Sequence, residues 1–178
     1  MHNLSIAIPI EGELLSDVIA AQALLQEQFG IKFQRHNQIY PHINLISGKV
    51  RGLNSLDPLF EKLPKLQKLD VESNGLGIFL DNSVSIFVRY LMTSNMLSLR
   101  SYFLKNKSCW SSIDQTTHIT FWLPKTTIAY RDISLMDLSR ISFELSNFDF
   151  YKLFEIKSLS IIEYCESKKE NETFSIKI

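Results

Sequence analysis

Apolar residues recur along the chain at two spacings, and these spacings divide it into strands and helices. Short runs rich in aliphatic and β-branched residues predict strands, whereas apolar residues repeated every three or four positions predict helices. The predicted helices are 16–30, 54–63, 94–106 and 134–146. The predicted strands are 4–10, 39–46, several within 69–91, the two halves of 117–132, and three near the end at 148–156, 158–165 and 173–178.

Capping and turn residues mark the limits of these elements. Ser16 can cap the first helix and Gly30 can end it, since a hydroxyl accepts from free backbone N–H groups and glycine readily adopts the left-handed conformation. Ser134 begins a capping-box sequence at the last helix. The turn-forming pairs Asn74-Gly75 and Asp81-Asn82 are expected to break the region 69–91. The resulting order predicts an α+β fold with helices on one side of mostly antiparallel sheets.

Length, composition and charge narrow the class of protein without identifying it. The 178 residues favour one domain, 1–178, built from two lobes that share a core. The 19 basic and 19 acidic residues balance to a net charge of +0, which argues against long duplex nucleic acid as a partner but is compatible with a small phosphorylated ligand. Two cysteines form no disulfide framework, and the start of the chain has no signal-peptide pattern. We therefore expect a cytoplasmic protein without a membrane span.

Two stretches of the chain repeat one polar pattern. IYPHINLI (39–46) carries His42 and Asn44 within an apolar strand, and LPKTTI (123–128) carries Lys125 and Thr127 in the same frame after a proline. The two copies lie about half the chain length apart, and each is followed by a polar break and a predicted helix. Residues two apart on a strand share a face, so each pair points in one direction. Two such strands related by a twofold axis would line one cleft with nitrogen bases and short polar groups, which suits a phosphodiester.

The pair of motifs resembles the two-histidine (2H) phosphoesterase superfamily, which includes the LigT-type 2'-5' RNA ligases and the cyclic phosphodiesterases. PHINLI matches the first His-x-Thr/Ser motif of that family, LPKTTIAYRD resembles the second, and LSIAIPI and GLGIFLDNSVSIFV are similar to its opening and middle strands. The resemblance covers most of the chain. It implies a bilobal, pseudo-twofold α+β fold with mostly antiparallel sheets around a central cleft and with the helices outside. The ligand it implies is a 2',3'-cyclic phosphate, a 2'-5' linkage or a cyclic (oligo)nucleotide, bound as a small nucleotide or an RNA end.

The resemblance also assigns roles to residues. His42 corresponds to a catalytic acid/base, Asn44 and Thr127 to donors for phosphate oxygens, and Lys125 stands where the second histidine is expected. Tyr130 and Arg131 follow the second motif and are candidate ligand contacts. We expect a monomer with no cofactor and no metal site, since no metal-ligand spacing connects the histidines and cysteines.

Lys125 is the departure that leaves activity open. The pKa of an ordinary lysine is about 10.4, so Lys125 is expected to be charged and to neutralise phosphate well. A charged lysine is a poor acid and no base, unless burial opposes its charge. Losing one acid/base partner typically costs about 10²–10⁴ in rate. The sequence is thus compatible with a hydrolase, with a catalytically impaired nucleotide-binding protein that senses or sequesters its ligand, and with a scaffold that lost the site.

A second alignment of the later motif is also open. His118 and Thr120 form a His-x-Thr string of their own in HITF. His118 lies at an odd offset from Lys125, which places it on the opposite face of a continuous strand. A bulge at Pro124 could reverse that parity. The proline frame and the following IAYRD favour Lys125.

Overall fold

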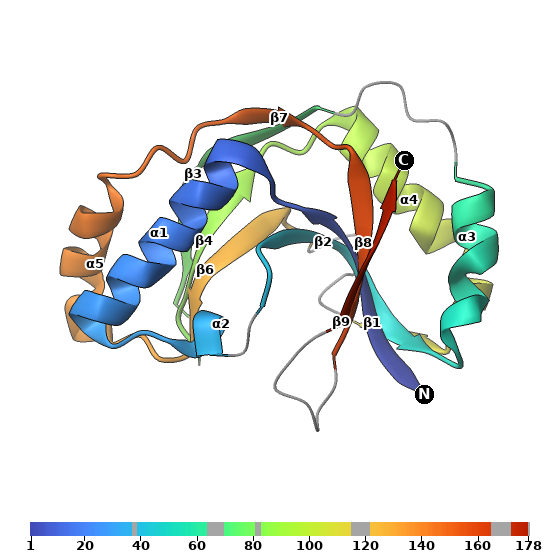
Figure 1. Ribbon diagram of the computed structural model, residues 1–178, viewed down its shortest axis with the longest axis horizontal. Helices are drawn as coiled ribbons and strands as arrows, with labels where there is room; N and C mark the ends of the chain where they lie inside the picture. Colours follow the sequence, from blue (N-terminus) through green and yellow to red (C-terminus); the bar gives the residue numbers. More distant parts are fainter. Residues whose placement is uncertain (37–38, 64–69, 81–82, 115–121, 165–171, 178) are drawn as a thin grey trace.

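The computed structural model of the 178-residue chain describes residues 1–36, 39–63, 70–80, 83–114, 122–164 and 172–177. Its strands form two sheets that face each other across the middle of the molecule (Figure 1). All of the described strand pairings are antiparallel. This agrees with the predicted α+β class.

The first sheet is five-stranded, in the order β5-β2-β1-β8-β9. Its strands are β1 (His2–Pro9), β2 (His42–Val50), β5 (Ser112–Ile113), β8 (Ser158–Glu163) and β9 (Glu172–Lys177). The second sheet is four-stranded, in the order β6-β4-β3-β7. Its strands are β3 (Asp70–Phe79), β4 (Ser85–Tyr90), β6 (Lys125–Tyr130) and β7 (Leu153–Glu155).

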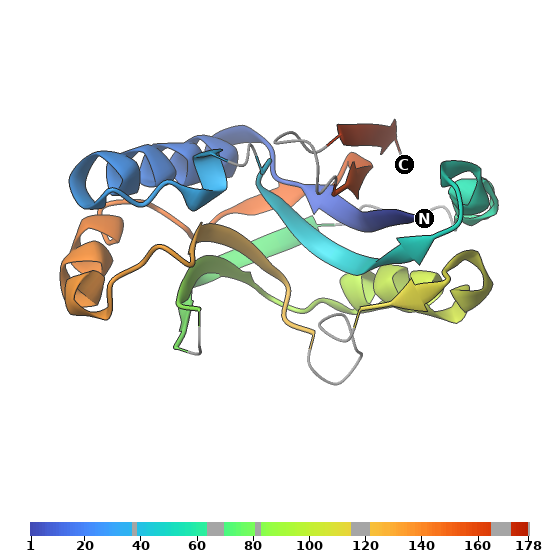
Figure 2. The ribbon, with the colours of Figure 1, turned by 90° about the horizontal axis from the view of Figure 1, so that it is seen from below.

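The helices lie outside the sheets, at the two ends of the molecule (Figures 1 and 2). Helices α1 (Gly12–Phe29) and α5 (Leu138–Leu145) lie beside the four-stranded sheet, whereas α3 (Asp57–Glu61) and α4 (Ser94–Lys105) lie beside the five-stranded one. A single-turn helix α2 (Phe33–His36) contacts β6. Short 3₁₀ turns are η1 (Leu53–Leu56), η2 (Lys107–Cys109) and η4 (Leu135–Asp137).

The chain contains an internal structural repeat. The order β1-α1-β2-α3 in the first half corresponds to β4-α4-β6-α5 in the second. In each half the strand before the long helix pairs with the strand after it, because β1 pairs with β2 and β4 pairs with β6. The long helices are exchanged between the sheets: α1 follows β1 but contacts β6, and α4 follows β4 but contacts β2. The exchange ties the two lobes together.

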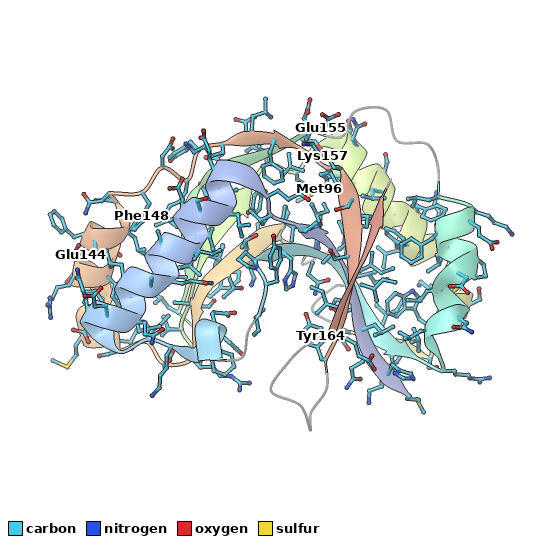
Figure 3. The ribbon with its side chains drawn as sticks, in the orientation of Figure 1. Met96, Glu144, Phe148, Glu155, Lys157 and Tyr164 are labelled. Atoms are coloured by element: carbon cyan, nitrogen blue, oxygen red, sulfur yellow. The ribbon has the colours of Figure 1, made fainter. Side chains whose placement is uncertain are left out.

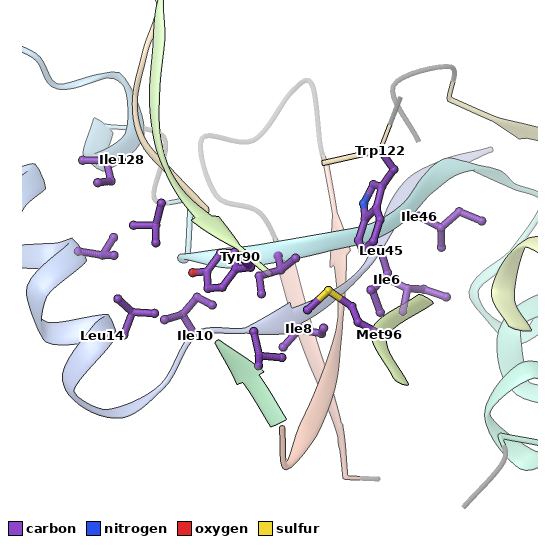
Figure 4. Close-up of a cluster of buried hydrophobic side chains, with 14 of the residues drawn as sticks. Ile6, Ile8, Ile10, Leu14, Leu45, Ile46, Tyr90, Met96, Trp122 and Ile128 are labelled. Atoms are coloured by element: carbon purple, nitrogen blue, oxygen red, sulfur yellow. The ribbon is translucent and has the colours of Figure 1, made fainter. Parts of the chain in front are cut away.

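One hydrophobic cluster includes side chains of both sheets. Strand β1 is buried on both faces from Leu4 to Ile8, and these residues are apolar apart from Ser5. Each fully buried aliphatic side chain of this kind stabilises the fold by about 1.5–3 kcal/mol. The side chains where the two lobes meet are Ile6, Ile8, Leu45, Tyr90, Met96, Trp122 and Ile128 (Figure 4).

Two local predictions were wrong. Helix α1 begins at Gly12 rather than at Ser16, and the Ser16 hydroxyl donates to the Gly12 carbonyl inside the helix instead of capping it. Asn74-Gly75 does not end a strand, because β3 continues through it with an irregularity in its pairing to β4. The predicted cap at Ser134 is confirmed, because its hydroxyl accepts from the Met136 N–H, although the first turn after it is 3₁₀ and α5 follows that turn.

The predicted end of α1 at Gly30 is confirmed. Gly30 has φ 71° and its N–H donates to the Gln26 carbonyl, as expected for a left-handed helix end.

Candidate active site

A cleft of about 590 Å³ lies between the two sheets, within the range typical of small-molecule sites. Both motif strands contribute to it. His42 and Asn44 come from β2, and Lys125 and Thr127 come from β6. The other lining residues are Gln34, Ile39, Tyr40, Pro41, Phe79, Ser83, Ser85, Trp122, Leu123, Tyr130 and Tyr164. No acidic side chain is among the described residues that line it, so the cleft favours an anionic ligand.

The two motif strands carry a β-bulge at the same position of the repeated pattern. On β2, Asn44 lies opposite Ala7 and Ile46 lies opposite Ile6, so Leu45 is the extra residue. On β6, Thr127 and Ala129 lie opposite consecutive residues of β4, so Ile128 is the extra residue. In the sequence alignment of the motifs Leu45 and Ile128 are equivalent. The correspondence therefore extends from sequence to backbone, and each bulge follows directly on the polar pair that faces the cleft.

Two hydrogen bonds join the second motif to the backbone of the first. The Thr126 hydroxyl donates to the His42 carbonyl at 3.0 Å and accepts from the Tyr90 hydroxyl at 2.8 Å. The Trp122 indole N–H donates to the Asn44 carbonyl at 2.8 Å. Among the described residues, β5 pairs with β2 at Gly48 and Lys49 alone, so these bonds supply partners to the part of the β2 edge that no described strand covers. The relative position of the two motifs is thus set by buried polar contacts.

His42 is held as a neutral base. Its Nδ1 lies 2.7 Å from the Tyr40 carbonyl, and a carbonyl only accepts, so Nδ1 carries the proton. In the neutral imidazole Nε2 is then the unprotonated nitrogen. Burial lowers the pKa of His42, and nearby Lys125 lowers it further, although the bond to the Tyr40 carbonyl opposes both effects. The imidazole is therefore neutral near physiological pH and ready to accept a proton.

Lys125 is half-buried, and burial lowers its pKa as well. Its Nζ donates to the Thr127 hydroxyl oxygen at 3.1 Å. The same nitrogen lies 5.4 Å from the ring centroid of Phe87 and 6.0 Å from that of Phe79. Burial therefore opposes the positive charge expected of this lysine from the sequence. The lower pKa of the ammonium is closer to the range in which a group acts as a general acid.

The short polar residues of the two motifs are held differently. The Thr127 oxygen accepts from Lys125, which leaves its own hydroxyl proton for a ligand oxygen. The Asn44 amide donates to the Ser47 hydroxyl, and its buried Oδ1 has no hydrogen-bond partner among the described residues. From Ser47 a chain of hydroxyls runs through Ser5 at 2.6 Å to Tyr164 at 3.3 Å. The second amide proton of Asn44 is the one left for a ligand.

The remaining sequence candidates have different positions. Tyr130 lines the cleft and meets Phe33 edge-on at 5.6 Å. Arg131 is exposed, has φ 73°, and its guanidinium lies over the rings of Phe33 and Tyr130 at 5.3 and 5.1 Å, outside the described lining of the cleft. His118 and Thr120 lie outside the described residues.

Several lining residues could not be found from the motifs. Tyr164 follows β8 and faces the opening between the lobes (Figure 3), while Phe79 and Ser85 flank the turn between β3 and β4. Gln34 comes from α2, which the sequence did not predict. No spacing signal marks these residues, because their place in the cleft depends on strand pairing across the fold.

No family model matches the sequence, and no curated protein matches it. Solved structures do match. TT0787 of Thermus thermophilus superposes with a TM-score of 0.66 at 15% identity, over 99% of this chain and 96% of that one. E. coli LigT complexed with 3'-AMP superposes with a TM-score of 0.64 at 12% identity, over 99% of this chain and 95% of that one.

The chain has the LigT fold. E. coli LigT complexed with NADP+ gives the same result, with a TM-score of 0.61 at 12% identity and the same coverage. The bilobal fold expected from the resemblance to 2H phosphoesterases is thereby confirmed over nearly the whole chain.

Two further properties of the described residues bear on the type of site. They contain no group of three or more His, Cys, Asp or Glu side chains arranged to hold a metal ion. None of the helices they form has the length and apolar character needed to cross a bilayer.

Proposed function

We propose that the protein is a phosphoesterase of the LigT type that acts on a 2',3'-cyclic phosphate, a 2'-5' linkage or a cyclic (oligo)nucleotide. The observation that carries this proposal is the placement of His42 and Lys125 at equivalent positions of two bulged strands lining one cleft. Two proton-transfer groups on opposite walls match an in-line displacement at phosphorus, where one oxygen attacks and another leaves.

The proposed reaction uses one group on each side of the phosphorus. His42 Nε2 takes the proton of the attacking water or ribose hydroxyl while that oxygen forms its bond to phosphorus. The bond to the leaving oxygen breaks, and Lys125 donates a proton to it. The Lys125 ammonium and the Thr127 hydroxyl also neutralise the non-bridging oxygens as charge develops. Solvent then returns a proton to Lys125 and removes one from His42.

The ligand class has support from the structural neighbours. E. coli LigT has been solved in complexes with ATP, 3'-AMP, NADP+ and phosphate. These molecules share a phosphate group, and the cleft of this chain is lined by His42 and Lys125 without a described acidic side chain. The proposal therefore includes a small nucleotide or RNA end as partner, bound by a monomer in the cytoplasm. Asn44, Tyr130 and Arg131 remain candidate ligand contacts.

A second function is favoured by Lys125 itself. A lysine that stays charged beside bound phosphate neutralises it without supplying an acid. The same cleft would then bind a nucleotide or RNA end tightly and leave it intact, as a sensing or sequestering protein.

One experiment separates the two functions. The wild type and the variants His42→Ala, Lys125→His and His118→Ala are incubated with 2',3'-cyclic AMP, a 2'-5' linked dinucleotide and a cyclic dinucleotide. Binding is measured by calorimetry and product by chromatography. His2→Ala is the matched control, because His2 pairs with Glu163 away from the cleft lining.

Turnover that His42→Ala abolishes and His2→Ala retains supports the enzyme. Binding without product, together with turnover appearing in Lys125→His, supports the binding protein. Absence of both binding and turnover in every variant overturns both functions. Loss of turnover in His118→Ala alone would assign the second motif to His118.

A further inference from the structure

Lys125 is held without an acidic partner among the described residues. Its Nζ contacts the Thr127 hydroxyl and lies over the rings of Phe87 and Phe79, at 5.4 and 6.0 Å from their centroids. The face of an aromatic ring attracts a cation within about 6 Å. The two rings are also in contact with each other, with centroids 4.6 Å apart. The ammonium is thus held by an aromatic pair and one hydroxyl.

Strand register places the Phe87 ring beneath this lysine. Phe87 lies on β4, directly opposite Thr127 of β6 on one side and Gly77 of β3 on the other. A Cβ atom added at Gly77 would come within 2.4 Å of the Phe87 ring. Real side chains do not approach that closely, so the Phe87 ring occupies the space that a side chain at residue 77 would need. Phe87 is 2% exposed, and its orientation is therefore fixed by packing.

We propose that Phe87, in the space left by Gly77, is the positioning residue that holds the Lys125 ammonium at the cleft in place of a carboxylate partner. A carboxylate would cancel the charge of the lysine and compete with an anionic ligand. A ring face adds no net charge, so the cation stays available. Lysine has three donors, and the bond to Thr127 uses one of them, which leaves the others for ligand oxygens. The catalytic consequence rests on the proposed function, but the contact itself does not.

Other charged groups near Lys125 do not supply the missing partner. His42 on β2 is close enough to interact electrostatically with Lys125, and Arg89 lies directly opposite Lys125 on β4. Both are bases. The Arg89 guanidinium donates to the Asn74 carbonyl at 3.2 and 3.0 Å. Among the described neighbours, the two rings and the Thr127 hydroxyl favour the charged form of Lys125.

Fluorination of Phe87 tests this role with little change of shape. Replacing Phe87 by mono-, tri- and pentafluorophenylalanine progressively withdraws the negative charge from the ring face. The pKa of Lys125 is followed by NMR of its Nζ and Cε in the free protein, and the affinity for inorganic phosphate is measured by calorimetry. We expect the pKa to fall stepwise with fluorine content, and phosphate affinity to fall by about 2- to 5-fold.

The control is the same series at Phe103, which is 0% exposed and packs against Phe60 and Tyr102 rather than Lys125. That series should leave the Lys125 titration unchanged. A flat titration across the Phe87 series, or an equal fall in the Phe103 series, overturns the proposal. If a fluorinated Phe87 protein does not fold, the series at Phe79, whose side chain is 40% exposed, must give a smaller fall in the same direction. A flat Phe79 series then overturns it.

The free-protein titration separates this inference from the proposed function. A stepwise fall of the Lys125 pKa in a protein that binds no phosphate ester would leave the positioning role intact and overturn the proposed function. Catalysis that depends on His42 with an unchanged Lys125 titration would do the reverse.

Discussion

Strands β2 and β6 share a backbone design and differ in the nitrogen base that each presents. Both carry a polar pair followed by a bulge, at Leu45 in one and Ile128 in the other. His42 is oriented by a backbone carbonyl two residues before it, whereas Lys125 is oriented by a hydroxyl and by aromatic rings. A short, rigid imidazole needs only one local hydrogen bond, while a flexible lysine needs contacts along its length.

The same physical effect has opposite consequences at the two positions. Burial lowers the pKa of both His42 and Lys125. For His42 the pKa moves further below pH 7, so the imidazole stays unprotonated and can act as a base. For Lys125 the pKa moves down toward pH 7, which makes the ammonium a better acid. A lysine can therefore occupy the position of an acid without matching the titration of a histidine.

The largest expected effect comes from removing the base. His42→Ala should lower kcat/KM by about 10²–10⁴, the usual contribution of one general acid or base. Ligand affinity should change far less, because Lys125 and Thr127 remain to neutralise the phosphate. Steady-state kinetics on the substrate identified by the panel measures both quantities. A variant within a few fold of wild type would remove His42 from the mechanism.

Lys125→Arg tests whether the second motif needs the positive charge of Lys125 or its ability to donate a proton. Arginine keeps the positive charge but does not release a proton in proteins, so turnover should fall by about 10²-fold or more while affinity stays within a few fold. Lys125→Met, which keeps the length without the charge, should weaken both affinity and turnover. Full turnover in Lys125→Arg would show that the charge alone is needed. Calorimetry and single-turnover rates distinguish these results.

Thr126→Val tests the bond that aligns the two strands. Thr126 is fully buried, and the substitution leaves the His42 carbonyl and the Tyr90 hydroxyl without their partner. A loss of about 1–3 kcal/mol in the free energy of unfolding follows from unpaired buried polar groups. Urea titration measures it. The double variant with Tyr90→Phe should recover part of the loss, because one unpaired group is then removed, and strict additivity would contradict the shared bond.

A smaller effect is the pH dependence of stability that His42 contributes. Because folding lowers its pKa, the unfolded chain binds more protons once the pH falls below about 6.5. Stability should therefore fall as the pH falls through that value and level off below the pKa of the folded state. His42→Gln should flatten this part of the profile. Urea unfolding across this range measures it, and an unchanged slope in His42→Gln would contradict the lowered pKa.

Repetition in the sequence was the strongest guide to the site. PHINLI and LPKTTI sufficed to predict two strands with paired polar residues facing one cleft, and the structure brings these four residues together. The bulges were not predictable, since an extra residue shows only when the partner strand is in register. Nor was the exchange of α1 and α4 between the lobes, because each helix has the same amphipathic pattern whichever sheet it covers.

The environment of Lys125 was beyond sequence reasoning for a different reason. Whether a lysine is charged depends on its burial. The rings of Phe79 and Phe87 lie near the Lys125 ammonium because β3, β4 and β6 pair across the sheet, although both residues are distant from it in the chain. From sequence alone, Lys125 is assigned the ordinary pKa of lysine. Burial in the folded protein lowers that pKa. The sequence shows that Lys125 replaces a histidine. The effect of this replacement on proton transfer can be inferred only from the folded structure.

The most direct test of the account follows both bases in one titration. Protein labelled with ¹⁵N at histidine and lysine is titrated with 2',3'-cyclic AMP, and the His42 Nε2 and Lys125 Nζ signals are recorded together. The account predicts that both signals shift and saturate with one dissociation constant, while His2 does not respond. A shift of only one of them, or two different dissociation constants, would contradict the claim that the two strands form a single phosphate site.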